Sequence, residues 1–114
     1  MDLTNIIVGL SCIGCAALYV GLAIPLLRDR VKPNMMYGMR IAKAFESDEN
    51  WYSINRYGAR QFVIWAVPLA LFGVVCFFLP PMKDNVSLAL VAGLAPVWAL
   101  IPPVVAILRY ARTL

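Results

Sequence analysis

Three apolar runs that contain no charged residue dominate this 114-residue sequence. They cover residues 6–27, 61–79 and 86–108. A helix needs about 20 predominantly apolar residues to cross the roughly 30 Å hydrocarbon core of a bilayer. The sequence therefore predicts an all-α integral membrane protein with three transmembrane helices, joined by a long loop over residues 28–60 and a short turn over residues 80–85.

Composition and charge agree with this fold class. Hydrophobic residues make up 62% of the chain, whereas soluble domains are closer to about half apolar. The net charge is +4, but the basic residues are too few and too dispersed to follow a nucleic-acid backbone, so no nucleic-acid partner is expected. No repeat or linker divides the chain, and we expect one domain over residues 1–114.

The basic residues indicate an orientation in the membrane. Seven of the ten Lys and Arg residues lie in the loop and two lie in the C-terminal tail, while only Lys83 lies in the turn between the second and third runs. Cytoplasmic loops carry an excess of Lys and Arg. This distribution predicts that the N-terminus is outside and the C-terminus cytoplasmic. Several apolar side chains within residues 35–45 further indicate that the loop lies on the membrane surface or packs under the helices.

Within the loop, Ser47 followed by Asp48 and Glu49 is typical of a helix N-terminus. A serine side chain can accept a hydrogen bond from an otherwise unpaired N–H group, and the helix dipole favours acidic residues in the first turn. We therefore expect a helix to start near residue 47 and to continue into the second apolar run.

The first apolar run also carries small residues at helical spacing. Ser11, Gly14, Cys15 and Gly21 fall near one face, and small residues allow another helix to approach closely. We expect this face to pack against protein. Cys12 and Cys15 are better explained as small packing residues than as metal ligands, because the chain has no histidine and only one other cysteine.

Missing residue types exclude several functions. No charged residue lies in the predicted spans, whereas ion and proton pathways need ionisable groups inside the bundle. No histidine is present, which removes the commonest general base and metal or haem ligand. The sequence predicts a protein that is not an enzyme, with no catalytic residue, no metal and no intrinsic cofactor. A bound lipid or pigment stays open.

Two blocks of residues in the loop resemble the signature of the SdpI family. The first is Pro33-Asn34-x-x-Tyr37-Gly38-x-Arg40, and the second is Glu49-Asn50-Trp51-Tyr52-x-x-Asn55-Arg56. The resemblance implies a small membrane protein of the bacterial cytoplasmic membrane. Named members confer immunity to a secreted peptide toxin, some also hold a transcriptional repressor at the membrane, and most have no assigned role.

Two interpretations of the motif residues remain open. In a structural one, Trp51, Tyr52 and Tyr57 lie at the membrane interface, Arg40 and Arg56 pair with lipid phosphate or with Glu46, Asp48 or Glu49, and Asn34 and Asn55 cap backbone groups. This interpretation is favoured for any single residue. In the other, the same side chains bind a protein partner, because Trp, Tyr and Arg supply most of the binding energy at interfaces.

For the loop as a whole we favour recognition, on the strength of the family resemblance. The first functional hypothesis is thus a non-catalytic membrane protein that acts through residues 32–60 in immunity or partner binding. The alternative is an accessory subunit that stabilises a large respiratory or photosynthetic membrane complex. Both predict membrane lipids and other integral membrane proteins as partners.

Overall fold

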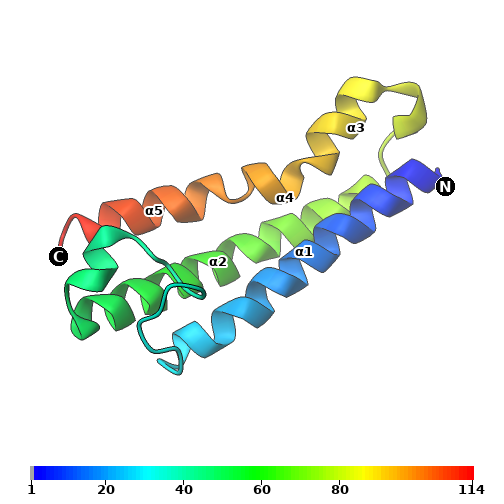
Figure 1. Ribbon diagram of the computed structural model, residues 1–114. Helices are drawn as coiled ribbons and strands as arrows, with labels where there is room; N and C mark the ends of the chain where they lie inside the picture. The colour runs from blue at the N-terminus through cyan, green and yellow to red at the C-terminus, as the bar shows by residue number, and fades with distance from the viewer. Residues whose placement is uncertain (1) are drawn as a thin grey trace.

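The computed structural model describes residues 2–114, which form helices and connecting segments and contain no strand (Figure 1). The order of the elements is α1 (Leu3–Leu27), η1 (Ala42–Glu46), α2 (Asp48–Cys76), η2 (Met82–Asp84), α3 (Val86–Gly93), α4 (Ala95–Trp98) and α5 (Ile101–Ala111), where η denotes a 3₁₀-helix. The all-α expectation is confirmed.

Two helices are long and apolar enough to cross a membrane. These are α1, with 25 residues, and α2, with 29 residues. The segment from α3 to α5 meets the same criteria only if its two halves, which are bent by 43° at a break, count as one span. The described residues therefore contain two candidate spans, or three with the bent segment. The molecule is elongated (Figure 1). The connection from α1 to α2 lies at one end, and the connection from α2 to α3 lies at the other.

Helices α1 and α2 form an antiparallel pair, and the residues along their seam recur in alternating steps of three and four. This spacing averages 3.5 residues and keeps one stripe of each helix facing its partner, as in a coiled coil. Most members of the stripe are small, which lets the backbones approach closely. On α1 the stripe is Asn5, Gly9, Cys12, Ala16, Tyr19, Ala23 and Leu26, and on α2 it is Asn55, Ala59, Phe62, Ala66, Leu69, Gly73 and Cys76.

The backbones of the two helices approach each other closely at Gly9 and Gly73. A Cβ atom on Gly9 would lie 2.6 Å from the carbonyl oxygen of Gly73, and a Cβ on Gly73 would lie 2.7 Å from the carbonyl oxygen of Gly9. The backbone of one helix contacts the backbone of the other here, so a shift of a side chain could not make room for an added Cβ atom. Only glycine fits at both positions.

The predicted packing face of α1 is not the one used within the chain. Ser11, Gly14 and Gly21 are exposed, Cys15 is half-buried, and nothing lies within 4 Å of a Cβ built on either glycine. Gly14 is five residues beyond Gly9, which places it about 140° around the helix from the seam. The packing of this face against another protein stays a prediction, and spacing alone could not show which stripe of α1 faces α2.

The third apolar run, predicted as a span over residues 86–108 whose prolines break its hydrogen bonds, is divided into α3, α4 and α5. Pro96 has no N–H group, so the carbonyl of Ala92 loses its helical partner and the helix breaks. The Cys12 thiol of α1 donates to that carbonyl oxygen at 3.7 Å, and the Tyr19 hydroxyl donates to the carbonyl oxygen of Pro96 at 2.6 Å. Trp98 Nε1 caps the carbonyl oxygen of Val91 at 2.8 Å.

The chain resumes as α5 with two further prolines, Pro102 and Pro103, in its first turn. Proline is tolerated there because N–H groups of the first turn have no intrahelical acceptor. Residues Pro103, Ile107 and Ala111 follow at four-residue steps and are buried. This stripe seats α5 against α2.

Asn5 ties the end of α2 to the start of α1. It is 1% exposed, and its Nδ2 lies 3.0, 2.9 and 3.3 Å from the carbonyl oxygens of Cys76, Leu79 and Pro80. Its Oδ1 accepts from the backbone N–H of Met82 at 2.9 Å. Pro80 cannot donate to Cys76, and α2 therefore ends at Cys76 rather than at the predicted residue 79.

Replacing Asn5 by Ala should destabilise the helix pair. The change leaves buried carbonyl groups and the Met82 N–H without partners, at a cost of about 1–3 kcal/mol. Unfolding in mixed micelles, followed by titration with a denaturing detergent, measures the loss. Ser11→Ala is the matched control, because Ser11 is an exposed residue whose hydroxyl donates only to the carbonyl of Ile7. Equal stability of N5A and S11A would contradict this role.

Candidate functional site

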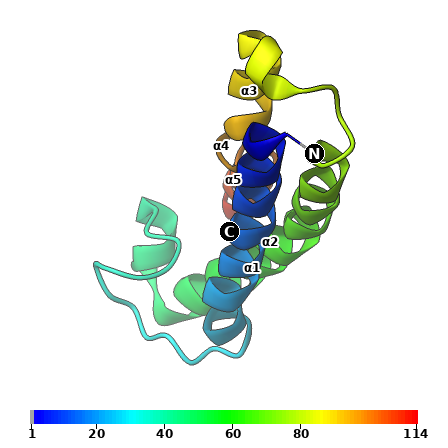
Figure 2. The same cartoon turned by 90° about the vertical axis from the view of Figure 1, so that its right-hand side faces the viewer.

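The candidate site is the segment of residues 28–47, which leaves α1 and curves back along the first turns of α2 (Figure 2). It lies at the same end of the molecule as the C-terminus (Figure 1). Asp29 has φ of 55° and Gly38 has φ of 117°, so the chain turns sharply at both positions. The predicted loop is therefore folded onto the helices, and α2 begins inside it at Asp48, where Ser47 Oγ accepts from the Asn50 N–H at 3.0 Å.

Trp51, in the first turn of α2, is the largest buried side chain that holds the segment in place. It is fully buried, and its Nε1 donates to the carbonyl oxygen of Val31 at 2.8 Å. The ring of Phe45 lies against it with the centroids 5.3 Å apart. A buried tryptophan with its N–H group satisfied contributes a large apolar surface at one fixed orientation. Trp51 is thus a core residue of the segment, rather than one exposed at a membrane interface.

Asn55 holds the segment one turn further along α2. Its Oδ1 accepts from the backbone N–H of Met39 at 2.5 Å, and its Nδ2 donates to the carbonyl oxygen of Trp51 at 2.9 Å. Gly38 lies directly over both residues: a Cβ atom there would be 2.7 Å from Asn55 Oδ1 and 3.0 Å from Trp51 Cζ2. The three motif residues therefore form one contact, in which glycine is needed for its conformation and for space.

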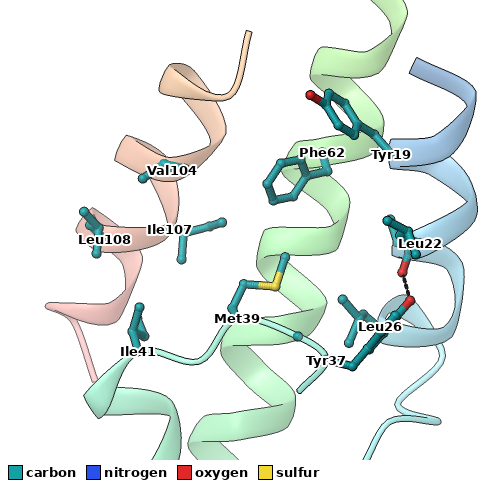
Figure 3. Close-up of a pocket in the computed structure, with 12 residues that line it drawn as sticks. Tyr19, Leu22, Leu26, Tyr37, Met39, Ile41, Phe62, Val104, Ile107 and Leu108 are labelled. Carbon is teal, nitrogen blue, oxygen red and sulfur yellow. Dashed lines mark hydrogen bonds between the residues drawn. The ribbon is translucent and has the colours of Figure 1, made fainter. Parts of the chain in front are cut away.

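Asn34 and Tyr37 shape the part of the segment that precedes Gly38. Asn34 Oδ1 accepts from the N–H groups of Met36 and Tyr37 at 2.9 and 2.7 Å. This is the local turn that asparagine favours. The hydroxyl of Tyr37 donates to the carbonyl oxygen of Leu22, which pins the turn to α1 (Figure 3).

The arginines of the motif make contacts that the sequence did not predict. Arg40 donates to the carbonyl oxygen of Met35. Arg56 pairs with Asp29 at 3.0 Å, and both side chains are about 40% exposed. Asp29 was missed because it lies just after the C-cap of α1, Arg28, and far from Arg56 in sequence. An exposed pair of this kind contributes only about 0.2–1 kcal/mol.

The remaining motif residues lie on the first turns of α2. Asn50 Nδ2 donates to the carbonyl oxygen of Lys43 at 3.2 Å, which joins η1 to α2. Tyr52 is half-buried against the cluster that contains Trp51. Glu49 is exposed in the first turn, where the helix dipole favours its charge.

The C-terminal helix adds two contacts that sequence reasoning did not anticipate. Tyr110 stacks on Tyr57 with ring centroids 4.2 Å apart, and its hydroxyl lies 2.5 Å from that of Ser53. The four-residue spacing of Pro103, Ile107 and Ala111 was the available signal that this helix returns to α2.

The site has two exposed methionines and an apolar cavity. Met35 and Met36 at the tip of the segment are 70% and 91% exposed. An apolar cavity of about 440 Å³ lies under the segment, between α1, α2 and α5, with walls that include Tyr19, Leu22, Tyr37, Met39, Phe62 and Ile107 (Figure 3). Among residues 2–114, no group of three or more Cys, Asp or Glu side chains is placed to hold a metal ion.

Gly38→Ala should open the segment without disturbing the spans. The new methyl group meets Asn55 and Trp51, and a non-glycine residue at such a backbone angle costs about 1–3 kcal/mol. We expect amide hydrogen exchange at Met39 to rise at least fivefold in a lipid nanodisc. Gly14→Ala is the control, since nothing lies within 4 Å of its Cβ. Unchanged exchange in G38A would show that the segment does not depend on this contact.

Comparison with known proteins identifies the family. A family model described as the SdpI/YfhL protein family matches residues 30–107, which is more than half of the chain. No curated protein and no solved structure gives a significant match. The match spans the segment from residue 30 onward, α2 and most of the bent third segment. The chain therefore belongs to the SdpI/YfhL protein family and is a membrane protein with transmembrane helices.

Proposed function

We propose that this chain is a non-catalytic, immunity-type protein of the bacterial cytoplasmic membrane that binds a protein partner through the segment of residues 28–47. Family membership supports the immunity class. The observation that carries the choice of surface is the contact of Gly38 with Asn55 and Trp51, because it holds the segment in one conformation. A preorganised loop loses little conformational entropy when it binds.

In this proposal, buried motif residues support the surface and exposed neighbouring residues form it. Trp51 and Asn55 are buried and hold the backbone, so they support the surface rather than forming it. Met35 and Met36 project from the tip, and flexible methionines suit adaptable apolar contacts. A partner would meet these methionines first.

For the membrane orientation we propose three spans, with the bent α3–α5 segment as the third, the N-terminus outside and the C-terminus cytoplasmic. Nine of the ten Lys and Arg residues belong to the loop and the tail, which lie together at one end of the molecule (Figure 1). Lys83 alone belongs to the turn at the other end. The proposed partner surface would then face the cytoplasm.

The residue inventory supports a non-catalytic role. The sequence has no histidine. Glu46 pairs with Lys43 at 3.1 Å, and Glu49 lies exposed in the first turn of α2. Neither residue lines the apolar cavity, so neither presents a carboxylate to a bound molecule there.

A Met35→Ser, Met36→Ser double variant tests the displayed surface. Neither side chain makes an internal hydrogen bond among the described contacts, so the protein should insert and unfold as the wild type does. Losing two apolar anchors should reduce partner affinity at least tenfold. Survival of cells challenged with the secreted peptide toxin of the same bacterium reports the effect.

The control for that experiment is Val86→Ser, an equally exposed apolar position at the far end of the molecule. A photoreactive residue placed at position 36 should also cross-link to the partner, while one at position 86 should not. Full protection by the double variant, together with no cross-link from position 36, would reject the proposed surface.

A second function, that of an accessory subunit in a larger membrane complex, is favoured by the outward stripe of α1. Gly14 and Gly21 have open space above them, and small residues of this kind allow a helix of another protein to pack closely. In this proposal the chain stabilises a respiratory or photosynthetic assembly.

Gly14→Leu with Gly21→Leu tests this alternative, because the leucines would hold a neighbouring helix away. We expect the variant to migrate on a native gel as the free protein rather than with a large complex. Val67→Leu, which enlarges an exposed position of α2, is the control. Migration of the double variant with a complex, as the wild type does, would exclude this stripe as the contact.

A further inference from the structure

We propose that the cavity between α1, α2 and α5 holds an acyl chain of an anionic phospholipid, with the lipid phosphate at Lys43 and Arg112. This site is independent of the partner surface at Met35 and Met36. It gives the folded segment a second role, which is to cover a lipid.

The chemistry of the cavity suits a hydrocarbon chain. Its volume of about 440 Å³ lies within the range of small-molecule sites. The two hydroxyl groups in its wall are already used, since Tyr19 donates to the carbonyl of Pro96 and Tyr37 donates to that of Leu22. A polar ligand would find no free hydrogen-bond donor among these hydroxyl groups, whereas a hydrocarbon chain needs none.

The position of the cavity selects lipid as the source of that chain. Helices α1 and α5 stand on either side of α2, and Phe62 projects from α2 into the space between them (Figure 3). The rims formed by Leu22 and Val104 are themselves about half exposed. In a membrane these rims face hydrocarbon, so a lipid chain can enter sideways without crossing water.

A basic hollow adjoins the cavity and supplies the place for a head group. It has a volume of about 350 Å³ and is lined by Ile41, Lys43, Leu108, Ala111 and Arg112. Ile41 and Leu108 also line the apolar cavity, so the two spaces share a wall. An amphiphile with an anionic head and an apolar tail matches this arrangement.

The charges around the hollow leave it positive. Lys43 pairs with Glu46 at 3.1 Å, and both groups are partly exposed. Arg112 makes no ion pair within residues 2–114, and Arg109 is exposed one turn earlier on α5. The two basic groups that line the hollow, Lys43 and Arg112, against the one carboxylate of Glu46 favour an anionic over a zwitterionic head group.

Head-group charge, rather than the acyl chain, should set the selectivity. Acyl chains lose little by moving between bulk lipid and the cavity, because both are apolar. A basic residue near an anionic membrane surface strengthens binding about fivefold. Two such residues should enrich phosphatidylglycerol over phosphatidylcholine about 25-fold in the protein-bound fraction.

The full chain is tested after extraction from vesicles of equal parts phosphatidylglycerol and phosphatidylcholine, and the retained lipids are counted by mass spectrometry. The wild type should retain phosphatidylglycerol preferentially. Lys43→Gln with Arg112→Gln should lose the preference, and Val104→Phe, which fills the cavity from its rim, should lower retention of both lipids. Lys83→Gln, at the other end of the molecule, should behave as the wild type.

Three results would overturn the proposal. Equal retention of the two lipids by the wild type would show that the site does not select an anionic head group. Unchanged retention by V104F would show that the acyl chain does not occupy the cavity. Displacement of the lipid by excess inorganic phosphate would show that Lys43 and Arg112 bind free anions. Leu108→Phe, at an exposed position on the other part of the rim, replaces V104F if the latter does not insert.

Discussion

The need to satisfy backbone carbonyl groups in an apolar environment organises this structure. Eight prolines occur in the chain, and a proline beyond the first turn of a helix removes an N–H group that the helix would use. At the two places where this breaks the structure, α1 supplies the missing donors. Asn5 serves the end of α2, and Cys12 and Tyr19 serve the break between α3 and α5. Every buried side-chain nitrogen and oxygen in residues 2–114 has a partner.

This role of α1 depends on its close contact with α2. Gly9 and Gly73 bring the two backbones together, which places Asn5 within reach of the carbonyls that follow Cys76. In lipid, apolar burial gives little drive for helix association, and close packing with interhelical hydrogen bonds takes its place. The seam of small residues and the interhelical hydrogen bonds therefore stabilise the α1–α2 pair together.

The motif residues of the folded segment follow the same logic at the other end of the molecule. Asn55 accepts a hydrogen bond from the backbone N–H of Met39, and Trp51 donates one to the carbonyl oxygen of Val31. Gly38 has no side chain and leaves space for the loop to lie against both residues. Residues that define the family signature thus hold a shape. The proposed partner surface at Met35 and Met36 and the proposed lipid site at Lys43 and Arg112 occupy positions that the signature does not specify.

Sequence alone determined the membrane class, the all-α fold, the capped start of α2 at Ser47 and the family, because these depend on local composition, spacing and motif. Tertiary structure alone decided which stripe of α1 meets α2, that Arg56 pairs with Asp29, and that Asn5 is the buried tie at the chain turn. Those outcomes depend on which donors and small surfaces meet across residues far apart in sequence. Helical periodicity places residues on a face, but only packing selects which face is covered.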